Sequence, residues 1–304
     1  MATTSYGIND ALTVKRWARR LAVEALKATE IAPLIGTSSS SIIHKKNELK
    51  DGGDKVTFGL RTQLSGDGVT EAQVLEGNEE SLTTYSDSLT VNELVHGVRV
   101  KGEGTIDNQR VLFNAREEGR QGLTDWFAKR LSVSFFNQVC GYTPQTNTLF
   151  TGLNATTAPS SGNQIWVDTA SNNSDGDENL ASDDVFALKY IDYAKEMAQT
   201  MTVPIRPLKI DGEDKYVLYL HPYQVTDLRT STSTGQWLDI QKAVYMGSRD
   251  KNPIYSGALG EYNGVILRSA FDVTKGASAA APTTAVATVR RAVLLGAQAA
   301  SMAF

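Results

Sequence analysis

Hydrophobic residues recur every four positions between residues 107 and 140, and this spacing predicts the longest helix of the chain. Most charged residues of the segment lie off this apolar stripe. A helix of about 30 residues would extend roughly 45 Å, which is long for a compact domain. We expect its core to be formed by Leu123, Trp126, Phe127, Leu131 and Phe135.

Residues 54–105 instead alternate with a period of two, which predicts β-strands. In the first strand Val56, Phe58 and Leu60 share one side. The intervening segment GDGVTEAQVLEGNEES, residues 66–81, is rich in glycine and in acidic residues. Because few large apolar side chains are present to anchor so long a β-excursion, we expect a partner surface to stabilise it.

The second half of the chain contains segments with the helical spacing of apolar residues and segments typical of strands. Residues 182–200 predict a helix, and the nearly apolar KYVLYLHP, residues 215–222, predicts a strand at the centre of a sheet. Residues 222–244 predict two short helices on either side of the polar TSTSTG. Residues 264–273 and 288–297 predict the final strands.

The N-terminal part of the chain predicts a helix that begins at Asn9 or Asp10 and ends before Pro33. The polar joint GTSSSS, residues 36–41, follows it. Two interpretations stay open here. The segment is either a detachable amphipathic arm or a helix that packs on its own domain.

Composition narrows the class of protein. A net charge of −4 disfavours a general nucleic-acid binder, which is normally basic. The single cysteine, Cys140, excludes an internal disulfide and fits a reducing compartment, and its apolar surroundings predict a buried side chain. The sequence shows no signal peptide and no apolar run of membrane-spanning length, so we expect a soluble protein made in the cytosol.

The histidines do not form a recognisable site. His44, His96 and His221 lie far apart, and neither His-x-x-x-His nor Cys-x-x-Cys occurs, so a structural zinc site is excluded. His221 follows a predicted buried strand, where enzymes often hold catalytic groups. A structural role is the favoured interpretation for a histidine that precedes a proline at a strand end.

The acidic segment DGDENLASDD, residues 175–184, is the best candidate for a metal site. Counted from Asp175, however, the sixth and twelfth positions hold Leu180 and Phe186 where an EF-hand loop requires Gly and Glu. We therefore interpret residues 175–184 as a solvated loop that includes Asp177. Its Ser182, Asp183 and Asp184 are expected to cap the following helix.

The glycine-rich stretch NPIYSGALGEYNGVIL, residues 252–267, raises the question of a phosphate site. The chain has neither a Walker loop nor G-x-G-x-x-G, and Glu261 would repel an anion there. No G-x-S-x-G elbow of a serine hydrolase occurs either. Backbone geometry is the remaining role for the glycines. We expect a positive φ in at least one of Gly257, Gly260 and Gly264, with Gly264 preferred because it follows Asn263.

Four stretches, read in order, resemble one family: HPYQVTDLR, WLDIQKAV, NPIYSGALGEYNGVIL and TVRRAVLLGAQAA. They are similar to the major capsid proteins of tailed bacteriophages, in the family defined on N-four-type podophages. The β-rich residues 53–91 followed by a long helix resemble the front half of the same family. The resemblance covers roughly residues 45–300.

The resemblance implies an α+β chain with the HK-97-like shell fold of tailed phages and herpesviruses. The parts it implies are an N-terminal arm, an extended β-hairpin loop, a peripheral domain around a long spine helix, an axial domain with a central sheet, and strands that return to the peripheral domain. Here they would correspond to residues 1–50, 51–105, 106–140, 141–260 and 261–304. Family members continue past LLGAQAASMAF, so we expect a shorter variant or a missing C-terminal portion.

The function implied is self-assembly into an icosahedral shell around a double-stranded DNA genome, without catalysis, cofactor or metal. The implied partners are further copies in hexamers and pentamers, the portal, a scaffolding protein, a decoration protein, and packaged DNA bound non-specifically at the inner face, with no membrane. The shell would form in the host cytoplasm. The alternative is a soluble α/β enzyme or carbohydrate-binding protein with a site near His221. A phage decoration or tail protein is a third interpretation.

Overall fold

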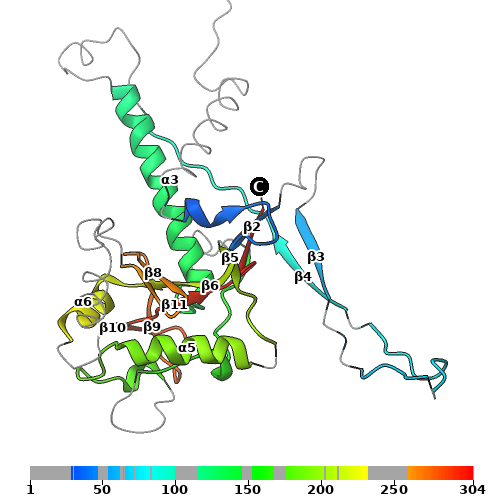
Figure 1. Cartoon of the computed structure of the whole chain (residues 1–304). Coiled ribbons are helices and arrows are strands. Elements are labelled where there is room, and N and C mark those ends of the chain that lie inside the picture. Colours follow the sequence, from blue (N-terminus) through cyan, green and yellow to red (C-terminus); the bar gives the residue numbers. More distant parts are fainter. Residues whose placement is uncertain are drawn as a thin grey trace, which may run out of the picture.

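The computed structural model describes residues 29, 31–46, 54–61, 64, 66–71, 73–82, 84–99, 115–145, 153–167, 176–201, 203–210, 212–231 and 259–303. Several expectations lie outside these ranges: the helix from Asn9, the second short helix within 222–244, and the conformations of Asp175 and Gly257. A sheet-containing body, one long helix and one projecting hairpin make up the described part (Figure 1). None of the helices in that part is long and apolar enough to span a membrane.

The body is built on a mixed sheet. Its strands are β5 (Leu208–Ile210), β6 (Glu213–Leu220), β7 (Glu261–Tyr262), β8 (Val265–Ser269) and β11 (Val293–Leu295). Their order is β11-β6-β8-β7, with β5 paired to β6. The apolar β6 is therefore central, as its sequence predicts. It runs parallel to β8, with Leu218 opposite Leu267, and antiparallel to β11.

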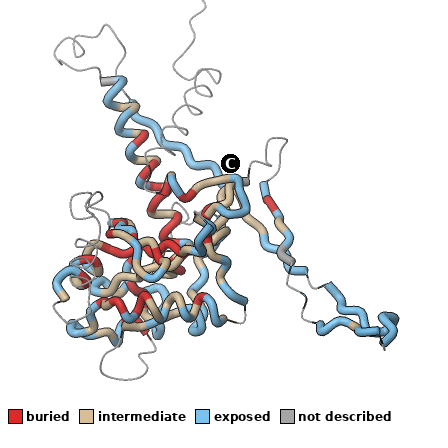
Figure 2. The backbone as a smooth tube through the Cα atoms, in the orientation of Figure 1, coloured by how far each residue is buried: buried red, intermediate tan, exposed pale blue. Residues whose placement is uncertain are grey.

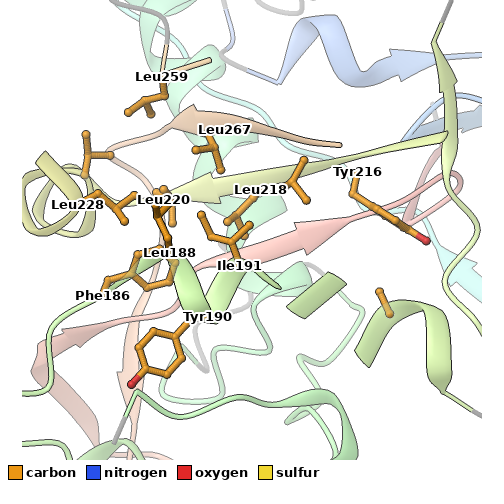
Figure 3. Close-up of a cluster of buried hydrophobic side chains, with 13 residues drawn as sticks. Phe186, Leu188, Tyr190, Ile191, Tyr216, Leu218, Leu220, Leu228, Leu259 and Leu267 are labelled. Atoms are coloured by element: carbon orange, nitrogen blue, oxygen red, sulfur yellow. The ribbon is translucent and has the colours of Figure 1, made fainter. Parts of the chain in front are cut away.

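Alternate residues of β6 serve two separate cores. Leu218 and Leu220 point into the first core, which contains Leu188 and Ile191 of α5 (Leu188–Thr200) and Leu228 of α6 (Pro222–Thr230) (Figure 3). Val217 and Tyr219 belong to the second core, which contains the Phe135 and Phe136 side chains of α3 (Ala115–Val139). A nearly all-apolar strand is what burial on both faces requires.

The long helix α3 presents a different face from the one that its apolar stripe predicts. The most buried line along the helix is Thr124, Ala128, Ser132, Phe136 and Cys140, one residue after the predicted stripe. Of the five predicted core residues only Phe135 is buried, and Leu123, Trp126, Phe127 and Leu131 are half-buried. Small side chains thus line the first part of the packed face and Phe136 its C-terminal part, while the large apolar side chains of Leu123, Phe127 and Leu131 lie along its margins.

Helix α3 ends through a local backbone motif. Gly141 has a φ of 60°, and Tyr142 N donates to Asn137 O at 2.9 Å while Gly141 N donates to Gln138 O at 3.2 Å. This is the hydrogen-bond pattern of a Schellman motif, in which glycine takes the left-handed conformation. A Cβ at Gly141 would also lie 2.7 Å from Thr157 O, so the close approach of the 153–160 segment requires glycine as well.

Two smaller sheets complete the body. β1 (Ile35–Gly36), β2 (Ile43–Lys46) and β12 (Ala300–Ala303) form one, with β2 parallel to both neighbours. β9 (Lys275–Ala277) and β10 (Ala285–Arg290) form the other. Within the described residues the 3-10 helices are η1 (Ala32–Leu34), η3 (Ser161–Asn163) and η4 (Asp177–Asn179).

Two of the segment boundaries that the resemblance implies do not coincide with the ends of packed units in the structure. Ile31, Leu34, Ile42 and Ile43 are buried in the second core, so residues 31–46, which were assigned to the arm, pack on the chain's own body. The central sheet contains strands from both sides of residue 260, so the boundary drawn there crosses one sheet. The assignment of segments to axial and peripheral parts of a shell stays a prediction.

One cap was predicted wrongly. Helix α5 begins at Leu188, and its N-cap residue, Ala187, makes no side-chain cap hydrogen bond. Asp184 instead accepts a hydrogen bond from Ala181 N at 2.9 Å, within the turn that precedes the helix. Asp184 stabilises that turn locally, and none of Ser182, Asp183 and Asp184 is the N-cap of the helix.

Candidate functional site

The hairpin is the most exposed part of the described chain. β3 (Lys55–Arg61) pairs antiparallel with β4 (Thr84–Thr90), from Lys55 opposite Thr90 to Arg61 opposite Thr84. Val56 is its one buried residue among those described, and the hairpin extends away from the body (Figure 2). A two-stranded hairpin with so little buried area is only marginally stable by itself in water.

The distal part of the hairpin, residues 62–83, is called the tip below. Its exposed large apolar side chains are Leu64, Val74, Leu75 and Leu82. The tip contains five acidic residues and no lysine or arginine: Asp67, Glu71, Glu76, Glu79 and Glu80. An apolar and acidic surface of this kind, held away from the body, is available to another molecule.

Hydrogen bonds brace the tip internally. Glu80 Oε2 accepts from Gly66 N at 2.7 Å and joins its two sides. Asn78 Nδ2 donates to Val74 O at 2.8 Å, and Gln73 N donates to Thr70 O at 2.9 Å. The exposed apolar side chains are therefore carried on a defined loop.

The base of the hairpin is fixed to the body by one side chain. Asn154 Oδ1 accepts from Thr90 N at 3.0 Å, and Asn154 Nδ2 donates to Thr90 O at 2.8 Å. The carbonyl of Asn154 accepts from Gln138 Nε2 of α3 at 2.8 Å. Beyond β4 the chain passes along α3, where the His96 ring lies 4.3 Å from that of Trp126. The hairpin is thus anchored at one end and exposed at the other.

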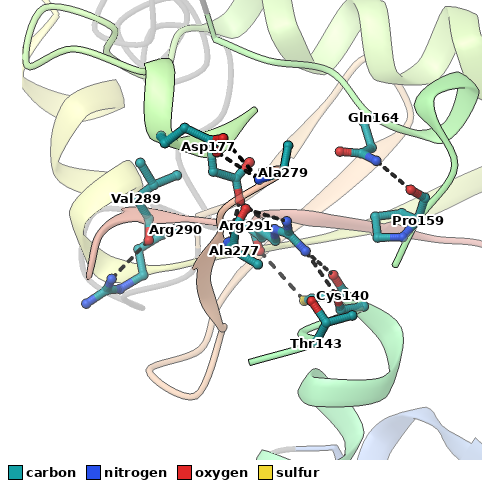
Figure 4. A network of polar contacts seen from close by, with 12 residues as sticks. Cys140, Thr143, Pro159, Gln164, Asp177, Ala277, Ala279, Val289, Arg290 and Arg291 are labelled. Atoms are coloured by element: carbon teal, nitrogen blue, oxygen red, sulfur yellow. Dashed lines mark hydrogen bonds and ion pairs between the residues drawn. The ribbon is translucent and has the colours of Figure 1, made fainter. Parts of the chain in front are cut away.

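A buried polar junction lies where the C-terminus of α3 meets the last strands (Figure 4). Arg291 Nε donates to Asp177 Oδ2 at 2.7 Å, and Arg291 Nη1 donates to the carbonyls of Cys140 and Gly141 at 3.1 and 3.0 Å. Asp177 Oδ2 also accepts from Ala277 N at 2.9 Å. A cation at the C-terminus of a helix donates hydrogen bonds to the unpaired carbonyls of the last turn and interacts favourably with the helix dipole.

This junction corrects the solvated-loop interpretation at Asp177, whereas residues 178–179 and 181–183 are exposed as expected. The Asp177 side chain is only 8% exposed, and its charge is paired. The neighbouring Glu178 accepts from the backbone amides of Ala279 and Ala280, and these bonds, that of Ala279 foremost, lower the pKa of its carboxyl group. The acidic loop thus holds the β9–β10 turn. Among the described residues no group of three His, Cys, Asp or Glu side chains could hold a metal ion.

Cys140 is buried, as its surroundings predict. Burial raises the pKa of its thiol, and the Sγ atom lies 3.7 Å from Arg291 O. A thiol with a raised pKa is a poor nucleophile at neutral pH.

His221 is an N-cap. Its Nδ1 accepts from Tyr223 N at 3.3 Å, and Gln224 Oε1 accepts from His221 N at 2.9 Å, which makes a reciprocal capping box at the start of α6. Burial, and secondarily the charge of Arg290, lowers the pKa of the imidazole. Its ring packs against those of Tyr223 and Phe271. These contacts account for the histidine as a structural residue.

The glycine-rich stretch forms a tight turn that α5 holds in place. Gly260 and Gly264 have φ values of 87° and 71°, and Asn263 has a φ of 47°. Lys195 Nζ donates to Asn263 O at 2.7 Å and to Asn263 Oδ1 at 2.9 Å. Asp192 accepts from Tyr262 Oη and from Asn263 Nδ2 at 3.0 and 2.9 Å. Lys195 and Asp192 thus both serve to hold the turn, which directs the chain into β8.

Sequence reasoning missed three of these residues. Asn154 lies in a polar stretch, and its role depends on a partner 64 positions earlier. Arg291 lies beside another arginine with nothing local to distinguish the two. Phe271 lies within a predicted strand but is 68% exposed in the turn after β8.

A family model described as phage capsid protein matches residues 3–304. The major capsid protein of Pseudomonas phage KPP25 is 27% identical over 281 residues, which cover 85% of this chain and 71% of that protein.

Solved structures agree. The capsid of Ralstonia phage GP4 is similar with a TM-score of 0.73 and 29% identity, covering 99% of this chain and 84% of that one. The Cyanophage Pam1 capsid asymmetric unit has a TM-score of 0.57 and 20% identity, over 82% of this chain and 70% of that one. At that identity the second likeness shows the fold alone.

Proposed function

This chain belongs to the phage capsid protein family, and from that premise we propose how its subunits join into a shell. It is a phage major capsid protein with the HK-97-like α+β shell fold, and its role is structural. We infer that each subunit lays its hairpin over a neighbouring copy and buries the tip there. The observation that carries this proposal is the asymmetry of the hairpin, which Asn154 anchors at its base while the apolar side chains of its tip are exposed.

The energetics favour burial of the tip between subunits. Full burial of one Val or Leu side chain contributes about 1.5–3 kcal/mol. The tip offers four such side chains, and the chain's own body does not cover them. A contact between unlike surfaces, repeated by rotation, closes rings and shells rather than only dimers, which is what a capsid requires.

The finer features of the assembly are proposals. Hexamers and pentamers in an icosahedral shell, a double-stranded DNA content, and portal, scaffolding and decoration partners follow from the family likeness. The net charge of −4 supports a container that holds DNA without binding it tightly. Host cytoplasm is the proposed place of assembly.

Absence of catalysis is also part of the proposal. The candidate groups described above have structural partners: His221 caps α6, Asp177 pairs with Arg291, and Cys140 is a buried thiol. These contacts support a structural role for each and offer no described constellation for the enzyme or carbohydrate-binding alternative.

The proposal is tested by replacing residues 64–82, which make up most of the tip, with a short Gly-Ser turn. Because the tip makes no contribution to either core, the subunit should keep its secondary structure and melting temperature. Shells should be lost in negative-stain microscopy, and sedimentation should show small species. Normal particles from the shortened chain would disprove the proposed role of the tip.

A further inference from the structure

We propose that an aromatic and cationic patch on the body receives the hairpin tip of a second copy. The patch comprises Tyr223, Phe271, Lys129 and Arg290. This inference rests on the proposed function, because it names the surface on which the tip docks. Its test below separates a wrong docking surface from a wrong role for the tip.

The two aromatic side chains of the patch are exposed and share one buried neighbour. Tyr223 is 65% exposed and Phe271 is 68% exposed. Both rings pack on the buried His221 ring, with centroid distances of 4.6 and 5.8 Å. The body thus presents two exposed aromatic rings to water, and the same buried His221 ring packs against each of them. Aromatic side chains are enriched at the core of protein–protein interfaces.

Each aromatic ring carries a cation. Lys129 Nζ lies 5.3 Å from the Phe271 centroid, and Arg290 Cζ lies 5.6 Å from the Tyr223 centroid. Lys129 is paired with Asp272 at 3.2 Å. Arg290 donates to the carbonyls of Ala287 and Val289, and no described carboxylate forms an ion pair with it. The patch therefore keeps net positive charge.

The patch is preorganised because its members come from separate, packed elements. Lys129 lies on α3, Tyr223 on the first turn of α6, Phe271 in the turn after β8, and Arg290 at the end of β10. Tyrosine and arginine are enriched among residues that dominate binding free energy at protein interfaces. A surface whose side chains are already fixed before binding loses little conformational entropy when a partner binds.

The tip complements the patch both in charge and in apolar character. Its five carboxylates, without a basic residue, match the positive charge of the patch, and its Leu and Val side chains match the aromatic rings. The tip cannot reach the patch of its own subunit, because the hairpin projects on the opposite side of the body from α6 (Figure 1). The occupant is therefore the tip of a second copy. Duplex DNA would satisfy the cations but not the exposed rings.

Disulfide trapping tests this contact. The natural chain has one cysteine, Cys140, and its burial and raised pKa keep it unreactive. A variant with Val74→Cys in the tip and Phe271→Cys in the patch should assemble and, after mild oxidation, give a ladder of linked subunits on a denaturing gel. Each single substitution should give no ladder. A matched pair, Val74→Cys with Val203→Cys, uses another exposed body position, 78% accessible, and should stay unlinked.

The outcomes are distinguishable. A ladder from the 74/203 pair alone would mean that the tip docks elsewhere, which overturns this inference and leaves the proposed function intact. No ladder from either pair, together with normal shells from the tip-deleted chain, would overturn both. If Phe271→Cys prevents folding, as circular dichroism would reveal, Tyr223→Cys replaces it with the same expected ladder.

A second measurement addresses DNA as the occupant. The 74/271 ladder should form equally in DNA-free particles and in filled ones. If the ladder is absent and the cysteine at position 271 resists maleimide only in filled particles, DNA covers the patch and the inference is wrong.

Charge exchange gives an independent readout: Arg290→Glu should reduce shell yield at least tenfold, and Glu76→Arg in the same chain should restore part of it. Unchanged yield with Arg290→Glu would contradict the electrostatic part of the proposal.

Discussion

Arg291 joins Asp177 across 114 positions of sequence, through a 2.7 Å bond from Nε to Oδ2. The same guanidinium holds the C-terminal carbonyls of α3, so one side chain connects the long helix, the acidic loop and the last strands. We expect this junction to be a principal determinant of subunit stability.

Asp177→Asn should therefore destabilise the subunit strongly, rather than modestly as the sequence alone indicates. Removing one partner of a buried ion pair typically costs about 3–5 kcal/mol, and we expect the lower end because Arg291 keeps its two carbonyl acceptors. Urea unfolding of the variant measures the change in free energy. Asp183→Asn, at an exposed position nearby, is the control and should change little. Equal stability of the two variants would contradict the assignment.

His221 should make stability depend on pH. Because its pKa is lowered in the folded state, the unfolded chain takes up a proton first as pH falls through the usual value of about 6.5. The contribution of His221 to the free energy of unfolding is thus complete above pH 6.5. As the pH falls towards 5, this contribution is lost and the free energy of unfolding declines. His221→Asn keeps a good N-cap residue but does not titrate, so this component should vanish. Identical pH profiles for both proteins, measured by urea unfolding, would exclude it.

His221→Ala tests the cap itself. Loss of an N-cap costs about 1 kcal/mol, so shells should still form with a modestly lower melting temperature. Complete loss of folding would show that the ring's packing against Tyr223 and Phe271 matters more than the cap. Thermal unfolding and negative-stain microscopy provide the two readouts.

Gly264→Val should misfold the subunit or block assembly without any ligand being involved. A β-branched residue at a φ of 71° costs about 1 kcal/mol or more, and the turn leads directly into β8 beside the central strand. Gly162→Val is a suitable control because Gly162 has no positive φ and a Cβ added there would meet no neighbouring atom. Equal soluble yields of both variants would argue against a backbone role.

Asn154→Ala should loosen the hairpin from the body. The change removes both bonds to Thr90, each worth about 0.5–1.5 kcal/mol, and leaves the bond from Gln138 to the backbone carbonyl. Hydrogen exchange at the amides of β4 should accelerate severalfold while exchange in β6 stays unchanged. Asn163→Ala, on an exposed 3-10 helix, is the control. Faster exchange throughout the body would indicate a general loss of stability instead.

The local pattern of apolar and polar residues was sufficient to predict the helices and strands whose buried positions recur at a regular spacing. The four-residue spacing within 107–140 predicts a helix, and α3 spans Ala115–Val139. The continuous apolar run of β6 predicts a central strand, because only burial on both faces favours such a run. Alternation at residues 54–61 predicts a strand, and the Asn-Gly pair at 263–264 predicts a tight turn into β8.

Tertiary structure decided what depends on residues distant in sequence. Periodicity identifies an apolar stripe but not what faces it, so the most buried line of α3 runs from the small side chains of Thr124, Ala128 and Ser132 to Phe136, which packs on Tyr219 of β6. The charge of Asp177 is buried because Arg291, far along the chain, compensates its desolvation. Likewise Tyr223 and Phe271 share a neighbour only because both pack on the His221 ring, a proximity that arises when α6 and the turn after β8 meet at the end of the central sheet.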